Sequence, residues 1–180
     1  MTPISIGYSS PISRLLALAE ISVRRPKQRF VVNMTWILLA AGLIVRGLSC
    51  APIPDEIGLS NGTLRACPQS PNCVVSENSR SESHVDPLTF KGDGPRSFQS
   101  LIKFLSAEPG VDLVTVEDGY AHAVFRTPIL RFQDDIELRL DPGLKVIHVR
   151  SASRIGYSDL GANRRRIESI RRRWHPPTDE

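Results

Sequence analysis

The sequence predicts an α+β fold, a two-layer sandwich in which a curved antiparallel sheet of four or five strands has helices packed on one face. Two pairs of extended segments predict the sheet, because each pair flanks a turn dipeptide, Asp118-Gly119 in the first and Pro142-Gly143 in the second. Two further segments, 95–106 and 161–174, carry apolar residues at helical spacing. The order is therefore strand, helix, four antiparallel strands, helix.

The composition is that of one ordinary globular domain. The chain has 180 residues, of which 41% are hydrophobic and 23% charged, and these values exclude collagen, a coiled coil, wholesale disorder and a multi-pass membrane protein. The first 49 residues hold six of the 23 Lys and Arg and one of the 19 Asp and Glu, so residues 50–180 carry a net charge of −1. The formal charge of +4 is therefore poor grounds for a nucleic-acid partner, and none is predicted.

The first two elements of the domain are a short strand and a helix. Residues 84–90 form the strand, which Pro87 interrupts. The helix has an apolar stripe at i, i+3, i+4 and i+7, formed by Phe98, Leu101, Ile102 and Leu105. Its expected ends are a cap at Asp93 or Gly94, Pro95 in the first turn, and a stop at Pro109-Gly110.

Two hairpins follow the helix. Residues 111–117 and 120–126 form the first, and residues 132–140 and 144–151 form the second. Pairing Asp141 with Leu144 sets Leu138 opposite Ile147, Ile136 opposite Val149, Glu137 opposite His148, and Asp135 opposite Arg150. Apolar residues then meet on one face and acids meet bases on the other, so this register is predicted.

The last element is a helix over about 161–174. Its apolar face consists of Ile167, Ile170 and Trp174, with Leu160 nearby. The spacing turns most of the other side chains toward solvent, namely Arg165, Arg166, Arg171, Arg172 and Arg173. This basic cluster has two interpretations, a solvated helix face or a contact with anionic lipid headgroups. Residues 176–180 are expected to fray.

Residues 24–49 have the order of an export signal, with basic, apolar and then small residues. The uncharged apolar run is about ten residues, too short to span a hydrocarbon core comfortably as a helix. The small residues lead to Cys50, which resembles the lipid-modified cysteine of bacterial lipoproteins. Ala51 then favours the outer membrane by the same resemblance. The alternatives are a cleaved secreted protein and an uncleaved N-terminal anchor.

This signal divides the chain into four parts. Residues 1–49 are the export signal, and residues 1–23 are superfluous to it, as in an over-long gene model. Residues 50–66 are a lipid-anchored tether rich in chain breakers. Residues 67–175 are the single α+β domain, followed by the tail.

Cys67 and Cys73 remain as an even pair once Cys50 is set aside for lipid. An exported chain matures in an oxidising compartment, where such a pair becomes a disulfide. A redox dithiol and a pair of metal ligands are the alternatives. Redox motifs usually have two residues between the cysteines, and a metal site needs more ligands than this pair.

Three motifs of the domain resemble the domain-of-unknown-function family numbered 1499. They are CPQSPNCV at 67–74, DDIE at 134–137 and RSASRIGYSDLGANR at 150–164, they occur in the family's order, and the resemblance extends over residues 67–173. The family has no established reaction. Its members are often exported or membrane-associated, so the resemblance implies the same location as the signal does.

The loop between the second hairpin and the last helix is the best candidate site. Backbone N–H groups at a helix start and nearby guanidinium groups can bind a carboxylate or phosphate. The ligand-binding candidates are Asp135, Glu137, Arg150, Ser153, Arg154, Tyr157, Asp159, Asn163 and Arg164. The structural alternative is that Arg154 clamps Asp134, Asp135 or Asp159, that Asp159 or Ser158 caps the helix, and that Tyr157 lies in the core.

A hydrolase-type enzyme is the second hypothesis, with Ser153, Arg154 and Asp159 as its residues. Ser151 or Ser153 needs His148 or His122 as a base, and no nucleophile elbow frames either serine. Adjacent carboxylates point to opposite faces of a strand, so Asp134 and Asp135 do not share one site. His84 and Asp86 share a face, but no metal and no cofactor is predicted.

The sequence thus predicts a lipid-anchored cell-envelope domain that faces the periplasm. Its expected partners are the membrane through the anchor and a small anionic or lipidic ligand or an envelope protein. The hydrolase and a purely structural envelope module are the alternatives.

Overall fold

The structure, a computed structural model, describes residues 36–40, 42–43 and 52–178. The chain divides into two units, 1–43 and 44–180, and the described residues of the first unit are helical. Within the described parts, no helix is both long and apolar enough to cross a membrane. Cys50 and Ala51 lie outside the described residues, as does most of the predicted export signal.

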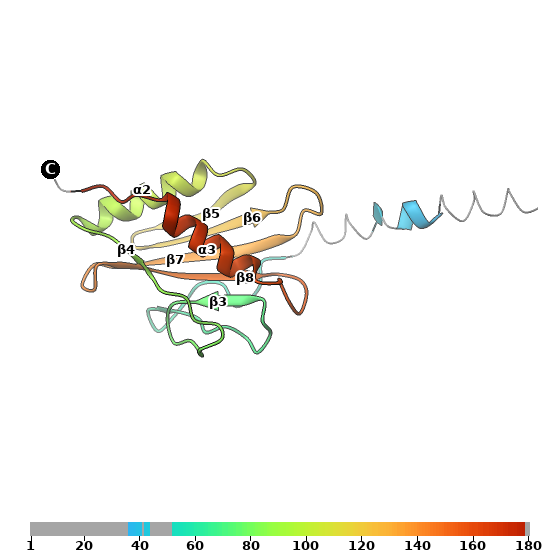
Figure 1. The fold of residues 1–180 in the computed structure, drawn as a ribbon, viewed down its shortest axis with the longest axis horizontal. Coiled ribbons are helices and arrows are strands. Elements are labelled where there is room, and N and C mark those ends of the chain that lie inside the picture. The colour runs from blue at the N-terminus through green and yellow to red at the C-terminus, as the bar shows by residue number, and fades with distance from the viewer. Residues whose placement is uncertain (1–35, 41, 44–51, 179–180) are drawn as a thin grey trace, which may run out of the picture. The chain divides into compact units, whose positions relative to one another are not determined.

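The second unit contains an antiparallel sheet that has six strands among its described residues (Figure 1). The strand order is β3-β8-β7-β6-β5, and β4 also pairs with β8. The strands are β3 (Cys73–Val75), β4 (Leu88–Thr89), β5 (Val111–Glu117), β6 (Tyr120–Arg126), β7 (Gln133–Asp141) and β8 (Val146–Ser153). The predicted α+β class and antiparallel sheet are confirmed. The sheet has more strands than expected because β3, beside the disulfide, pairs with the end of β8.

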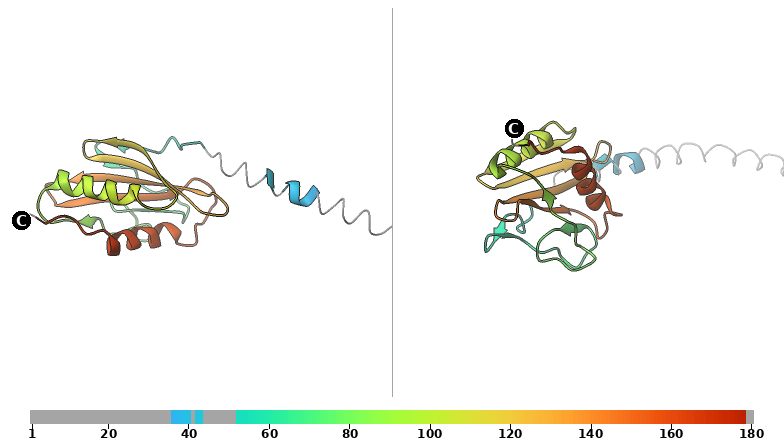
Figure 2. Two further views of the ribbon diagram at one scale, coloured as in Figure 1. Left: turned by 90° about the horizontal axis from the view of Figure 1, so that it is seen from above. Right: turned by 60° about the vertical axis from the view of Figure 1, so that its left-hand side comes forward.

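Two helices, α2 (Gly94–Ser106) and α3 (Ala162–Arg173), lie on one face of this sheet (Figure 2). Both predicted stripes are buried in one core against β6, β7 and β8, and Trp174 joins them. The Asp93 carboxylate caps α2 by accepting a hydrogen bond of 2.7 Å from the Arg96 N–H, and Pro95 lies in the first turn. Leu160, expected beside the apolar face of α3, is exposed instead.

The first hairpin has the predicted bounds and turn. Glu117 pairs with Tyr120 across Asp118-Gly119, and Gly119 has a φ of 78°, a conformation that glycine adopts at no steric cost. The register of β5 shifts between Leu113 and Thr115, which is a bulge in the outer strand.

The predicted register of the second hairpin is wrong by two residues. Asp141 pairs with Val146, and Glu137 therefore pairs with Arg150 rather than with His148. A shift of two residues keeps every side chain on its face, so apolar and charge matching does not distinguish the two registers. The turn does: residues 142–145 form the connection, Lys145 has a φ of 54°, and the Leu144 N–H donates to Asp141 Oδ1 at 3.0 Å.

The segment before β3 contacts the face of the sheet opposite the helices. It includes a two-stranded sheet, β1 (Leu59–Ser60) with β2 (Thr63–Leu64). Leu64 is buried with Val75 and Tyr120 in a second, smaller core. Part of the segment that the sequence analysis assigned to the tether therefore packs on the domain.

The disulfide and the strand before α2 complete the fold. Cys67 and Cys73 form the predicted disulfide, with their Cα atoms 5.6 Å apart. The strand expected over 84–90 is shorter, with only β4 and a single bridge between Val75 and His84. Pro87, which has no N–H to donate, lies between these two contacts.

Candidate functional site

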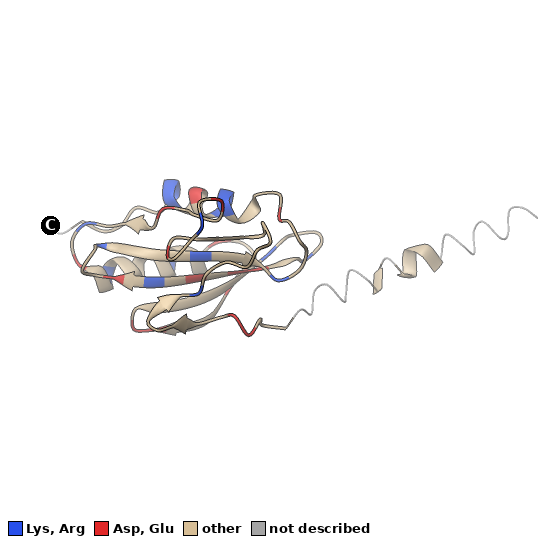
Figure 3. Ribbon diagram, turned by 90° about the horizontal axis from the view of Figure 1, so that it is seen from below, with Lys and Arg blue, Asp and Glu red and all other residues tan. Residues whose placement is uncertain are grey.

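Strand β7 separates the polar groups of the sheet into two sets, because its side chains alternate between the faces. Asp134 lies on the helix face and forms an ion pair with Arg166 of α3. Asp135 lies on the opposite face, as the sequence predicted for adjacent carboxylates. Figure 3 shows acidic and basic positions on neighbouring strands of the sheet.

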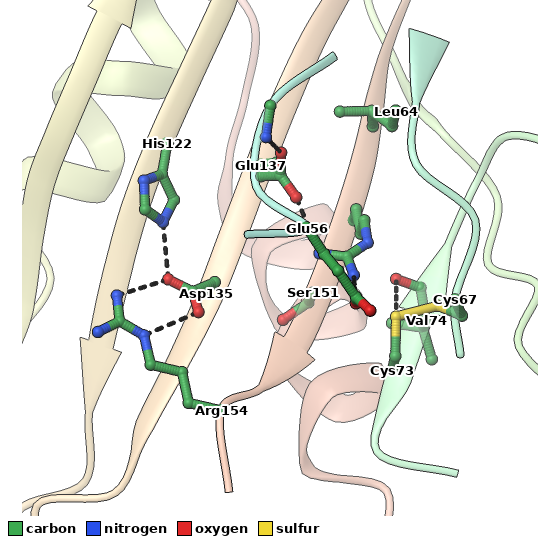
Figure 4. A network of polar contacts seen from close by, with 12 residues as sticks. Glu56, Leu64, Cys67, Cys73, Val74, His122, Asp135, Glu137, Ser151 and Arg154 are labelled. Atoms are coloured by element: carbon green, nitrogen blue, oxygen red, sulfur yellow. Dashed lines mark hydrogen bonds and ion pairs between the residues drawn. A yellow bond between two sulfur atoms is a disulfide. The ribbon is translucent and has the colours of Figure 1, made fainter. Parts of the chain in front are cut away.

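The first cluster on the face opposite the helices is centred on Asp135 (Figure 4). Arg154 donates from Nε to Oδ2 at 2.9 Å and from Nη2 to Oδ1 at 2.8 Å, and His122 Nε2 lies 2.7 Å from Oδ1. All three side chains are buried. Burial favours a higher pKa for Asp135, but the hydrogen bonds from His122 and Arg154 outweigh it, so the pKa lies below its usual value.

The second cluster is centred on Glu137, which is fully buried. Arg150 Nη1 donates to Oε2 at 2.9 Å. The Tyr120 hydroxyl donates to Oε1 at 2.9 Å, and the Gly58 N–H donates to the same oxygen at 2.7 Å. Burial and the neighbouring Glu137 carboxylate raise the pKa of Tyr120, so its hydroxyl stays protonated as a donor. This cluster therefore joins the sheet to the segment that precedes β3.

The third cluster contains a serine, a histidine and a carboxylate that the sequence analysis did not bring together. Ser76 Oγ lies 3.2 Å from His148 Nδ1, and His148 Nε2 lies 3.7 Å from Glu77 Oε1. Glu77 also forms an ion pair of 2.6 Å with Arg139. The Val149 N–H donates to the Ser76 hydroxyl at 2.9 Å, which fixes that hydroxyl to the sheet. Burial lowers the pKa of His148, which favours the neutral ring.

Asn163 connects the first turn of α3 to β8 and to the disulfide loop. Its side chain is buried and accepts from the Ser151 hydroxyl at 2.6 Å. It donates to the Asn72 carbonyl and to Ser153 Oγ, each at 3.0 Å. The hydroxyls of Ser151 and Ser153 thus contact Asn163, whereas the hydrolase hypothesis required His148 or His122.

Two of the remaining candidates, Asp159 and Arg164, also hold the fold. The Asp159 carboxylate accepts from the N–H groups of Gly161 and Asn163, at 2.8 and 2.7 Å, and so caps the start of α3. Arg164 donates to the carbonyls of His84 and Glu82. Tyr157, expected in the core under the structural alternative, is exposed.

The arginines of α3 are more engaged than their spacing suggested. Arg166 and Arg171 are half-buried rather than solvent-facing. Arg166 pairs with Asp134, and Arg171 donates to the carbonyls of Asp86 and Pro87. Arg173 pairs with Glu108. Much of the basic cluster therefore binds to the protein itself.

A groove of about 460 Å³ opens between the loop 127–132 and the loop 154–161. Its apolar wall consists of Phe132, Ile155 and Leu160. Its polar groups are hydroxyls, amides and carboxylates, from Thr127, Gln133, Asp134, Ser153, Ser158 and Asp159. Of the described residues that line it, none is basic. The groove therefore suits an apolar molecule better than an anion.

The structure divides the predicted site residues among three places. Ser153 and Asp159 line the groove, and Tyr157 belongs to the loop beside it. Asp135, Glu137, Arg150 and Arg154 are in the clusters of the opposite face, whereas Asn163 and Arg164 anchor the start of α3. Among the described residues, no group of three or more His, Cys, Asp and Glu is placed to hold a metal ion.

Sequence reasoning missed several contributors to these clusters, among them Tyr120, Glu77 and Asn72. Tyr120 was detectable, because it alternates with His122 on β6 and so shares the face of Asp135 and Glu137. Glu77 and Asn72 reach the sheet from irregular segments, where no periodicity marks a side chain's direction.

An open antiparallel sheet with two helices on one face and buried charge clusters on the other defines a small α+β domain. The chain belongs to the family described as protein of unknown function (DUF1499), whose model matches residues 63–173. No curated protein matches the chain. The matched region contains β7, β8, α3 and both loops of the groove.

Proposed function

We propose that this protein is a lipid-anchored domain of the cell envelope, facing the periplasm, that binds a lipidic ligand in the groove between the loops 127–132 and 154–161. The observation that carries the proposal is the groove itself, with its apolar wall of Phe132, Ile155 and Leu160 and a volume of about 460 Å³. That volume lies in the range of small-molecule sites. Hydroxyls at Ser153 and Ser158 can orient a polar head at its edge.

The charges of the groove favour a lipidic ligand over a small anion. The basic candidates Arg150, Arg154 and Arg164 make hydrogen bonds inside the domain. The charged residues that line the groove are Asp134, which is paired with Arg166, and Asp159, so an anion finds no basic partner among the lining residues.

Binding of a neutral apolar probe, 1-N-phenylnaphthylamine, tests the ligand. Ala162 lines the groove, and Ala162→Leu adds bulk there. We expect probe fluorescence to rise with the unaltered protein and the affinity to fall at least tenfold in Ala162→Leu. The control is Ala107→Leu, an exposed alanine at the other helix, which should bind as the unaltered protein does. Competition by inorganic phosphate, with no effect of Ala162→Leu, would refute a lipidic site in favour of an anionic one.

Native mass spectrometry of the protein extracted from its own membranes tests the anchor. We expect a chain that begins at Cys50 and carries extra covalent mass. A chain that still carries residues 24–49 would refute the lipoprotein.

A purely structural envelope module is the second candidate, favoured by the internal engagement of Arg154 with Asp135. It predicts no probe binding at all. The hydrolase using Ser153 gains no support from the described contacts, because Asn163 is the partner of that hydroxyl.

A further inference from the structure

We propose that one end of the domain, formed by the tips of the loops 127–132 and 154–161, inserts into the interfacial layer of a lipid bilayer. We call it the loop end. The inference rests in part on the proposed anchor at Cys50, and it adds an orientation: the loop end faces the membrane and the β7–β8 turn faces away from it.

The loop end exposes large apolar and aromatic side chains. Ile129, Leu160 and Tyr157 are 86%, 84% and 76% exposed. Three more lie beside them on the same two loops, namely Leu130, Phe132 and Ile155. Single exposed apolar residues are ordinary, but a cluster on adjacent loop tips marks an interaction surface.

The chemistry of these tips matches a membrane interface. Tyrosine is enriched at the boundary between headgroups and acyl chains, and Tyr157 projects from the second loop. Arg131 is exposed in the first loop, where its guanidinium can meet phosphate headgroups. The one acid of the two loops, Asp159, is half-buried and caps α3. Within these two loops, no exposed carboxylate therefore opposes insertion.

The course of the chain indicates the bilayer as the occupant. The segment 52–58 runs from the middle of the sheet, where the Gly58 N–H donates to Glu137, toward the end at which the loops 127–132 and 154–161 lie (Figures 1 and 2). Cys50 precedes Pro52 by two residues, and an extended residue spans at most about 3.6 Å. A lipid on Cys50 therefore holds this end of the domain, and not the other, at the membrane surface.

The opposite end of the sheet provides an internal control. The β7–β8 turn lies there, with exposed Lys145 and the half-buried Asp141 beside it. Leu144 is 69% exposed at its tip. It thus resembles Ile129 in size and exposure but lies at the other end.

Tryptophan quenching by brominated lipid tests the insertion. The full protein is reconstituted in vesicles of phosphatidylcholine and phosphatidylglycerol whose acyl chains carry bromine. We expect Ile129→Trp to add emission that brominated vesicles quench at least twofold relative to unbrominated ones. Leu144→Trp should add emission that bromine leaves unchanged. Trp174, the one tryptophan of a chain that begins at Cys50, is common to both variants and is subtracted with the parent protein.

Two outcomes would overturn the proposal. One is equal quenching of Ile129→Trp and Leu144→Trp, and the other is Ile129→Trp emission that brominated lipid leaves unquenched. Leu160→Trp repeats the test from the second loop, and equal thermal unfolding of all variants shows that they fold. The probe assay with Ala162→Leu and the mass of the anchored chain report separately on the proposed function.

Discussion

Asp135 accepts hydrogen bonds from both Arg154 and His122, and all three side chains are buried. Removal of one partner of a buried ion pair leaves an uncompensated charge, which typically costs about 3–5 kcal/mol. We expect Asp135→Asn to lower the free energy of unfolding by that amount in urea titrations at pH 7. The control Asp86→Asn changes an exposed carboxylate and should cost less than about 0.5 kcal/mol. Equal effects of the two substitutions would show that the buried cluster contributes little.

The same carboxylate makes stability depend on pH. The pKa of Asp135 is lower in the folded protein than in the unfolded chain, where it is about 3.9. The unfolded state therefore binds the proton first, so the stability contributed by Asp135 is present above about pH 4 and is lost as the pH falls through its folded pKa. We expect the free energy of unfolding, measured by urea titration at a series of pH values, to decrease below about pH 4. The decrease should be smaller in Asp135→Asn, and an identical slope would contradict this assignment.

The Cys67–Cys73 disulfide stabilises one element of the fold, the loop that leads into β3. It closes a short loop at the start of β3, the strand that pairs with β8, and Asn163 binds the Asn72 carbonyl of this loop. A loop of this length contributes about 2 kcal/mol through the unfolded state. We expect Cys67→Ser/Cys73→Ser to lower the free energy of unfolding by about that much while unfolding stays cooperative. A variant that does not fold would mean that the disulfide is required for the fold.

The β7–β8 turn offers a test of register. Lys145 has a positive φ, a conformation that costs an ordinary residue about 1–2 kcal/mol and is least tolerated by β-branched residues. We therefore expect Lys145→Gly to be more stable than Lys145→Val by at least about 1 kcal/mol in urea unfolding. If the turn instead had two residues, Pro142-Gly143, position 145 would lie in a strand. Lys145→Val would then be more stable than Lys145→Gly, because valine has the higher strand propensity.

The helices and strands were more predictable from the sequence than the strand register and the side-chain pairings were. The period of 3.6 in α2 and the Asp118-Gly119 turn are local signals, and both elements formed with nearly the expected bounds. The β7–β8 register depended on the backbone of one turn, which charge and apolar matching cannot distinguish from a shift of two residues. The sequence left three acidic partners open for Arg154, namely Asp134, Asp135 and Asp159. The choice of Asp135 depends on the tertiary fold. The groove requires two loops that are distant in sequence.

At the scale of the whole molecule, residues 50–180 have almost no net charge, and several arginines of α3 are bound internally. Apolar burial therefore dominates the proposed insertion of the loop end, and salt screens only electrostatic attraction. We expect the bromine quenching of Ile129→Trp to stay within about 20% between low salt and ~0.5 M salt, at which surface charges are strongly screened. A loss of quenching in salt would instead show that the basic cluster of α3 drives membrane contact.

The bulge in β5 has a consequence for neighbouring copies of the protein. β5 is the outer strand of the sheet, and within the described residues it pairs only with β6. An unpaired strand edge is a template for joining the sheets of neighbouring copies into larger aggregates. The irregular register between Leu113 and Thr115 breaks that template into two short pieces. The bulge therefore works against edge-to-edge joining of copies through β5, which matters most at the high density that the proposed anchor would create on a membrane.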